Sequence, residues 1–108
     1  MIPVDRLLLI IEELRKHDPE LPANQAAALL VIARQEGITQ LRVSALIGAS
    51  KSQGQRIFDK LSDKGVNGRP GLGLIEVRIG NLDARERLAY LSPKGRRVVQ
   101  SLAHFVVG

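Results

Sequence analysis

The sequence predicts a mainly α-helical fold that carries one small β-hairpin. Apolar residues recur at spacings of three and four in several segments, as they do on one face of a helix. Residues 75–79 instead alternate apolar and charged side chains, which is the two-residue period of a half-buried strand. Proline, glycine and serine separate these segments, at positions where helices and turns begin and end.

Length and composition restrict the class of protein. The chain has 108 residues, 44% of them hydrophobic and 25% charged, which suits one globular domain over residues 1–108. It contains no cysteine, and its two histidines, His17 and His104, are far apart without neighbouring metal ligands. We therefore expect no cofactor and no metal. The longest apolar run, residues 7–11, is too short for a membrane span, and no secretory signal precedes it, so we expect a cytoplasmic protein without a membrane partner.

The first helix is expected over residues 3–17 and has an unusually wide apolar surface. One stripe has the helical spacing of Val4, Leu7, Leu8, Ile11 and Leu14. Leu9 and Ile10 extend this stripe around most of the circumference, so the helix needs cover on more than one side. A second subunit is the economical source of that cover. The prolines of residues 18–22 end the helix, because the residue before a proline is restrained to extended geometry.

Three further helices are expected before the hairpin. The second covers residues 23–35, and a short third helix covers residues 42–47. Ser50 is a good N-cap for a fourth helix over residues 51–64, since its hydroxyl can accept hydrogen bonds from first-turn N–H groups. Gly65 is expected to stop that helix.

The second half of the chain predicts a loop, a hairpin and a last helix. Residues 66–73 form a glycine-rich loop, and the strand at 75–79 is followed by turn residues and a return strand at 87–91. The serine and proline at 92–93 then start a helix over residues 93–106.

This order of elements is that of a winged helix-turn-helix. We place the helix-turn-helix at residues 41–64, the wing at 74–91, and a dimer interface on the two terminal helices. Within the helix-turn-helix, small Ser44 can lie where two helices cross. Val43 and Ile47 of the third helix are expected to face inward, and Ile57, Phe58 and Leu61 are expected to anchor the fourth helix.

The opposite face of the fourth helix is polar and cationic. It presents amide, hydroxyl and cationic side chains that suit base edges and phosphates: Lys51, Ser52, Gln53, Gln55, Arg56 and Lys60. A solvated helix face in an interaction domain is the alternative interpretation. The charge distribution adds to this pattern, because residues 1–36 carry four cations against six acids, whereas residues 37–108 carry twelve cations against five acids. An excess of this kind indicates a polyanion partner but does not identify it.

Residues 41–66 resemble the recognition element of MarR-type transcription regulators. In that family the wing has an acid, a spacer and an arginine, as in Asp83-Ala84-Arg85, followed by a strand that ends in Leu-Thr/Ser-x-x-Gly, as in residues 91–95. The resemblance extends over about residues 23–100. It implies a homodimeric, sequence-specific regulator that binds double-stranded DNA, with the fourth helix in the major groove and the wing in the minor groove.

The resemblance also implies roles for particular residues. Arg85 falls at the arginine that enters the minor groove, and Asp83 falls at the acid that orients it; the simpler interpretation of Asp83 is turn chemistry alone. The residues expected at the DNA are Arg42, Ser50, Lys51, Ser52, Gln53, Gln55, Arg56, Lys60, Arg69, Asp83, Arg85 and Arg87. Those expected at the dimer interface are Val4, Leu7, Leu8, Ile11, Leu14, Leu102, Phe105 and Val106.

Three features depart from the family pattern. Gly54 replaces an apolar residue in the middle of the recognition helix, either for closer packing or leaving the helix looser until DNA binds. The loop at 66–73 is longer than usual, and its Arg69 is either an extra phosphate contact or part of a disordered bulge. The terminal helices are short, so the same two helices have to form the dimer interface and cover the core. Relatives often bind aromatic acids in pockets beside that interface, but this chain has only three aromatic residues, Phe58, Tyr90 and Phe105, which argues against a small-molecule effector.

Other classes of function fit less well. An enzyme needs converging acid–base or nucleophilic groups, whereas the acids here are spread as helix-surface partners of lysine and arginine. A winged helix that binds protein predicts acids or an apolar patch on the fourth helix, and residues 51–56 contain no acid. A DNA-binding structural factor without a regulatory role remains an alternative.

Overall fold

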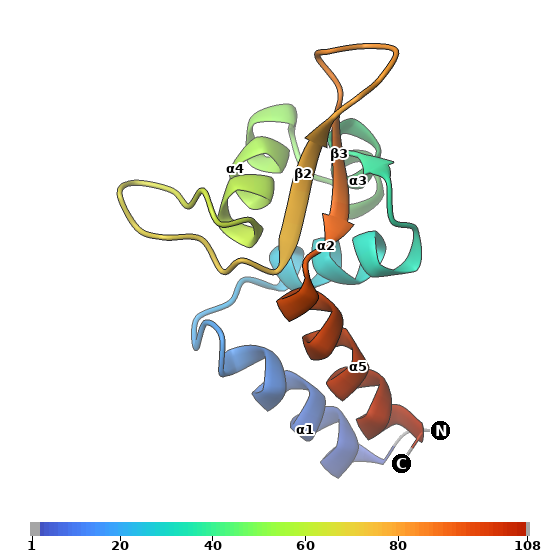
Figure 1. Cartoon of the computed structure of the whole chain (residues 1–108). Coiled ribbons are helices and arrows are strands. Elements are labelled where there is room, and N and C mark those ends of the chain that lie inside the picture. Colours follow the sequence, from blue (N-terminus) through green and yellow to red (C-terminus); the bar gives the residue numbers. More distant parts are fainter. Residues whose placement is uncertain (1–2, 108) are drawn as a thin grey trace.

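We analysed a computed structural model of the chain, which describes residues 3–107. Figure 1 shows a body of helices with a β-hairpin projecting from one end and two helices side by side at the other. The elements are α1 (Val4–Arg15), α2 (Ala23–Arg34), β1 (Ile38–Thr39), α3 (Gln40–Ile47), α4 (Lys51–Leu61), β2 (Ile75–Ile79), β3 (Arg87–Leu91) and α5 (Pro93–Val107). The predicted winged helix-turn-helix architecture is confirmed.

The sheet has three antiparallel strands in the order β1-β3-β2 rather than a hairpin alone. The predicted hairpin pairs Ile75 with Leu91 at one end and Ile79 with Arg87 at the other. The additional strand β1 pairs Ile38 with Ala89 on the outer edge of β3. Strand β1 was not predicted, because two residues are too few to establish an alternating pattern.

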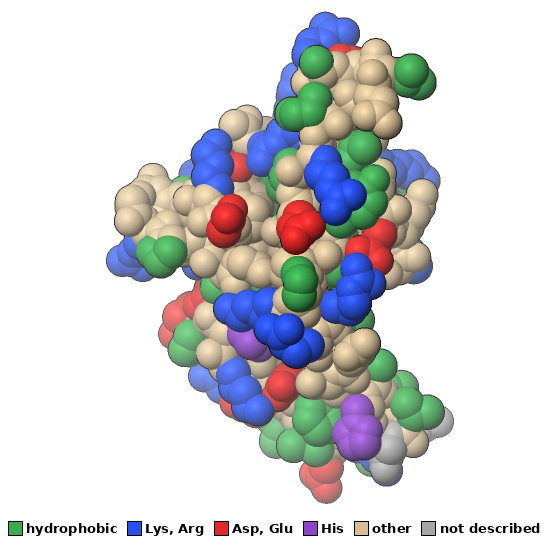
Figure 2. Space-filling model, viewed as in Figure 1, with side chains coloured by type: hydrophobic (Ala, Val, Ile, Leu, Met, Phe, Trp, Pro, Cys, Tyr) green, Lys and Arg blue, Asp and Glu red, His purple; other side chains and the backbone are tan. Residues whose placement is uncertain are grey.

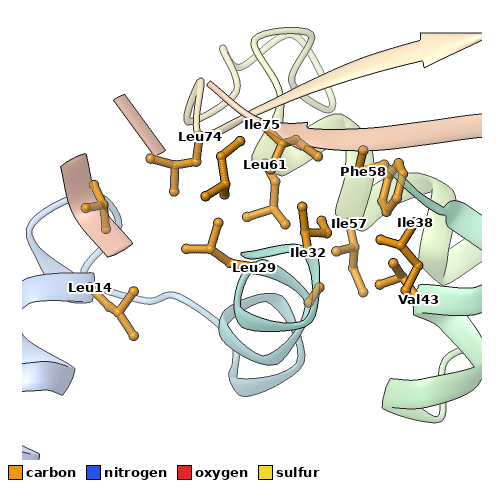
Figure 3. Close-up of a cluster of buried hydrophobic side chains, with 14 of the residues drawn as sticks. Leu14, Leu29, Ile32, Ile38, Val43, Ile57, Phe58, Leu61, Leu74 and Ile75 are labelled. Carbon is orange, nitrogen blue, oxygen red and sulfur yellow. The ribbon is translucent and has the colours of Figure 1, made fainter. Parts of the chain in front are cut away.

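The predicted helix-turn-helix residues lie in the hydrophobic core. Figure 3 shows side chains from α2, α3, α4 and the sheet meeting in one cluster. The largest fully buried side chains are Phe58, Leu29, Ile32, Leu61, Leu74 and Val43. Ile57 is also buried, and Ile47 is partly buried against the cluster. Ile57, Phe58 and Leu61 therefore anchor α4, the second helix of the motif, to the core as predicted.

Helix α3 begins two residues earlier than predicted. The Thr39 side-chain oxygen accepts a hydrogen bond from the Arg42 N–H at 3.1 Å, so Thr39 is the N-cap and the helix includes Gln40 and Leu41. Gly48, with a φ of 69°, ends α3.

Helix α4 ends at Leu61, three residues before the predicted end at residue 64. The chain turns back after Ser62, and the loop covers the open carbonyls at the end of the helix. The N–H groups of Gly65, Leu72, Gly73 and Leu74 donate to the carbonyls of Asp59, Lys60, Ser62 and Leu61, respectively, at 2.7–3.0 Å. The loop thus satisfies groups that a helix end leaves unpaired, and it is a folded segment rather than a disordered bulge.

Of the two interpretations of Gly54, closer helix packing is the one that the structure supports. A Cβ at this position would overlap Ser44 Oγ and would lie 3.1 Å from Ser44 Cβ. Ser44 is buried and donates its hydroxyl proton to the Gln40 carbonyl at 2.9 Å. Helices α3 and α4 therefore cross where small Ser44 meets Gly54, as expected for Ser44.

Residues 3–107 contain no helix that is both long and apolar enough to cross a bilayer. In the same part of the chain, no three His, Cys, Asp or Glu side chains are grouped to hold a metal ion.

We predict that Gly54→Ala destabilises the protein although alanine is the better helix former. The gain in helix propensity is about 1 kcal/mol, but overpacking the crossing costs more, so we expect a net loss of about 1–2 kcal/mol. Urea unfolding followed by circular dichroism measures this change. In the Ser44→Ala background the overlap with Oγ is gone, and Gly54→Ala should then cost clearly less; equal costs in both backgrounds would contradict the crossing argument.

Candidate nucleic-acid interface

The start of α4 is fixed by a reciprocal pair of hydrogen bonds. Ser50 Oγ accepts from the Gln53 N–H at 3.1 Å, and Gln53 Oε1 accepts from the Ser50 N–H at 2.8 Å. This capping box satisfies two donors that the helix leaves unpaired. Two of the residues expected at the DNA, Ser50 and Gln53, therefore also hold the helix start in shape.

The outer face of α4 has the polar, cationic surface that was predicted. Lys51, Ser52, Gln55 and Arg56 are exposed, and neither Lys51 nor Arg56 forms an ion pair with any residue from 3 to 107. Figure 2 shows Lys and Arg side chains around α4 and on the wing. These side chains offer hydrogen-bond donors and positive charge to a ligand that approaches this face.

The wing tip holds one arginine in a defined orientation. Asp83 Oδ1 accepts from the Arg85 backbone N–H at 2.9 Å and from its Nε at 3.2 Å, while Oδ2 lies 3.5 Å from Nη2. The backbone N–H and then the guanidinium of Arg85 lower the pKa of Asp83, which favours the ionised carboxylate. The Arg85 side chain is nevertheless 92% exposed. Asp83 thus combines turn chemistry with the orienting contact.

The wing tip and the start of α4 border the same hollow. It has a volume of about 320 Å³ and is lined by Arg85 and Asp83 of the wing, Lys51 of α4 and Gln40 of α3. Arg87 and Glu86 line it as well, so elements that are separate in sequence bring three cationic and two acidic side chains to one hollow. Gln40 was not among the predicted residues, and its buried Oε1 has no hydrogen-bond partner within residues 3–107.

Arg87, which we expected at the DNA and which lines this hollow, also makes a contact within the protein. Its Nη2 donates to Asp59 Oδ1 of α4 at 2.9 Å, and its guanidinium carbon lies 5.8 Å from the centre of the Phe58 ring. The side chain is only 24% exposed, and Asp59 also lies 3.6 Å from Lys64. Strand alternation alone did not identify this pair, because Asp59 and Arg87 are 28 residues apart.

Lys60, also expected at the DNA, forms an ion pair with a linker residue. Its Nζ lies 3.1 Å from Asp18 Oδ2 in the segment between α1 and α2. Partial burial alone would raise the pKa of Asp18, but the Glu20 N–H and the Lys60 ammonium outweigh it and lower that pKa. The lysine therefore ties α4 to the linker.

The remaining predicted DNA residues lie at separate places. Arg42 is exposed on the first turn of α3, and Arg69 is exposed on the loop that follows α4. Arg69 lines a second hollow together with Arg56 and Lys60, apart from the hollow at the wing.

The predicted dimer surface is largely exposed and apolar. Helices α1 and α5 pack side by side (Figure 1), and their outer surfaces leave large hydrophobic side chains uncovered. The exposed side chains that were predicted at the dimer interface are Val4, Leu7, Leu8, Ile11 and Val106, and Phe105 is half-buried. Leu9 of α1, which was expected to widen the apolar surface, is exposed too, and the exposed Leu30 of α2 was not predicted. Leu14 and Leu102 are each only 5% exposed, because they belong to the core of this chain.

The fold is that of known bacterial and archaeal transcription regulators. A MarR transcriptional regulator from Methanosarcina mazei Go1 has 19% sequence identity and a TM-score of 0.70, over 91% of this chain and 63% of its own. A DNA complex of MepR from S. aureus has 17% identity and a TM-score of 0.71, over 87% of this chain and 69% of its own. The PcaV transcriptional regulator from Streptomyces coelicolor, in complex with its natural ligand, has 23% identity and a TM-score of 0.64.

These likenesses define the fold class. The chain has the winged helix-turn-helix fold of MarR-type regulators, as the sequence resemblance implied. The part that matches PcaV is 81% of this chain but only 56% of the PcaV chain, so this chain spans little more than half the length of that structure. No family model matches the sequence, and no curated protein matches it.

We predict that Asp59→Asn destabilises the protein by about 1–3 kcal/mol, because it leaves the half-buried Arg87 guanidinium without its carboxylate. Asp63→Asn is the matched control, since Asp63 is exposed and forms no ion pair within residues 3–107. Chemical unfolding of the two variants gives the comparison. Equal stabilities would show that the Asp59–Arg87 pair contributes nothing.

Proposed function

We propose that the protein is a transcriptional regulator that binds double-stranded DNA as a homodimer. The observation that carries the proposal is the common hollow between the start of α4 and the wing tip, which borders Lys51 and Arg85. A helix start and a hairpin tip that face one side match two adjacent grooves of a duplex. The fold shared with MarR-type regulators, one of them in complex with DNA, supports the same assignment.

Helix α4 is the element proposed to enter the major groove. Gln55 and Arg56 carry the side-chain types that pair with adenine and guanine edges, and Lys51 and Ser52 suit phosphates. The capping box at Ser50 supports this role, because it fixes the helix start before DNA binds. The exposed Arg42 of α3 lies beside the same motif as a phosphate contact.

The wing is proposed to follow the neighbouring minor groove with Arg85 at its tip. A cationic side chain is favoured there by the negative potential of a narrow minor groove. Asp83 restricts the guanidinium in the free protein, which lowers the entropy lost on binding. The pair between Arg87 and Asp59 supports the wing indirectly, because it joins β3 to α4.

Two copies are needed to cover the apolar surface of α1. A second copy that packs on Leu7, Leu8 and Ile11 would remove them from water and place two α4 helices about a two-fold axis. Such a dimer reads two half-sites about one helical turn apart, or about 34 Å.

Selection of bound duplexes from a random pool tests this function. We expect a palindrome whose half-sites lie about 10 base pairs apart, or a multiple of that spacing. On the selected duplex, Arg85→Ala should weaken binding to all sequences and reduce the slope of log affinity against log salt by about 1.

Arg34→Ala is the charge-matched control, because Arg34 is exposed at the end of α2 and forms no ion pair within residues 3–107. An unchanged salt slope for Arg85→Ala would remove the wing from the interface. A pool that yields no enriched sequence, together with no binding in dilute buffer, would exclude the function.

We predict that Leu7→Asp or Ile11→Asp converts the dimer to a monomer, because each places a carboxylate in the proposed apolar interface. Sedimentation equilibrium at micromolar concentration measures the mass. Leu82→Asp is the control, since Leu82 is fully exposed on the wing and should leave the dimer intact. A monomeric wild-type protein would refute the interface.

A further inference from the structure

A tight turn in the loop after α4 holds Arg69 in place. The N–H groups of Val66 and Arg69 each donate to the carbonyl of the other residue, at 3.2 and 3.1 Å. Between them, Asn67 and Gly68 have φ angles of 55° and 75°. Two positive φ angles in an Asn-Gly pair are typical of a type I′ turn. Arg69 therefore projects from a defined backbone position.

The turn is seated closely against the end of α4. A Cβ at Gly65 would overlap the Arg69 carbonyl, and a Cβ at Gly71 would overlap the Ser62 carbonyl. Figure 1 shows the loop projecting sideways from the lower end of α4, away from the wing tip. The approach of backbone to backbone at two points restricts the ways in which the loop can move.

A polar hollow of about 530 Å³ lies between this turn, α4 and the first turn of α2. Arg69 of the turn, Arg56 and Lys60 of α4 and Gln25 of α2 line it. Lys60 is already paired with Asp18, whereas Arg56 and Arg69 form no ion pair within residues 3–107. The hollow therefore has an excess of positive charge that the described residues do not neutralise.

Gln25 adds an unsatisfied polar group to this hollow. Its Oε1 is buried and has no hydrogen-bond partner within residues 3–107. A buried polar atom without a partner is costly, so a polar ligand that pairs with this amide gains stability. Oε1 is an acceptor and does not pair with an anion, whereas Nε2 of the same amide is the donor that suits an anionic oxygen.

We propose that this hollow is a phosphate-binding site formed by Arg56 and Arg69. Their two guanidinium groups offer the forked donors that fit phosphate oxygens, and Lys60, which is paired with Asp18, borders the site. The turn positions Arg69 before the ligand arrives, which lowers the entropy lost on binding. The phosphate belongs either to a small phosphorylated molecule or to the backbone of the DNA that α4 contacts; only the second source rests on the proposed function.

The first arm of the test titrates inorganic phosphate into the full chain without DNA, with amide NMR shifts as the readout and chloride at equal ionic strength as the reference. We expect saturable shifts at residues 66–69 and at Gln25. Arg69→Ala should weaken the apparent affinity at least tenfold, and Arg34→Ala should leave it unchanged.

Gly68→Val separates geometry from charge. It retains every cation, and a Cβ at Gly68 meets nothing within 4 Å, but valine disfavours the positive φ of the turn. We expect this variant to weaken phosphate binding severalfold while keeping the fold, as monitored by the unshifted signals of α5.

The second arm measures the salt dependence of binding to the selected duplex. A slope reduced by about 1 in Arg69→Ala, but not in Arg34→Ala, assigns the site to a backbone phosphate. Saturable phosphate binding with an unchanged slope assigns it to a small phosphorylated molecule. If the wild-type protein binds the duplex but shows neither saturable phosphate binding nor a reduced salt slope in Arg69→Ala, this proposal is wrong and the proposed function still stands. If the wild-type protein does not bind the duplex, the proposed function is wrong, and the phosphate titration alone decides whether the site exists.

Discussion

The crossing of α3 and α4 is the contact on which the rest of the structure depends. Gly54 allows Ser44 to lie against the backbone of α4, and the core side chains Val43 and Phe58 are buried on either side of this approach. Because the inner face of α4 is buried in the core, Lys51, Ser52, Gln55 and Arg56 on its outer face are presented to solvent. A larger residue at the crossing would separate the helices and change the angle at which that face is shown.

Both ends of α4 and the wing are attached to this crossing by specific polar contacts. The capping box fixes the start of the helix, and the returning loop binds the carbonyls at its end. Arg87 then joins β3 to Asp59 on the same helix. As a result, the proposed groove-reading helix, the wing and the Arg69 turn form one connected unit, and their relative positions are set before any ligand binds.

The cations of the molecule divide into two groups with different roles. Arg87 and Lys60 are neutralised by Asp59 and Asp18 and stabilise the arrangement of elements. Arg56 and Arg69 lack such partners within the described residues and remain available to an anion. Net charge could not distinguish the groups, because pairing depends on which carboxylate the fold brings near. Arg85 is intermediate, since Asp83 orients it without burying it.

Local sequence determined the helices, the hairpin, Ser50 as a cap and Ser44 as the crossing residue, because spacing, capping and turn chemistry act over a few neighbouring residues. It also located the polar face of α4 and the Asp83–Arg85 contact, which spans two positions. Tertiary structure alone decided that β1 pairs with β3, that α4 ends at Leu61, and that Arg87 meets Asp59. Each of these depends on contacts between residues that are far apart in sequence, apart from the Gly65–Asp59 hydrogen bond at the end of α4, and their approach is fixed by packing of the whole core, which no local pattern encodes.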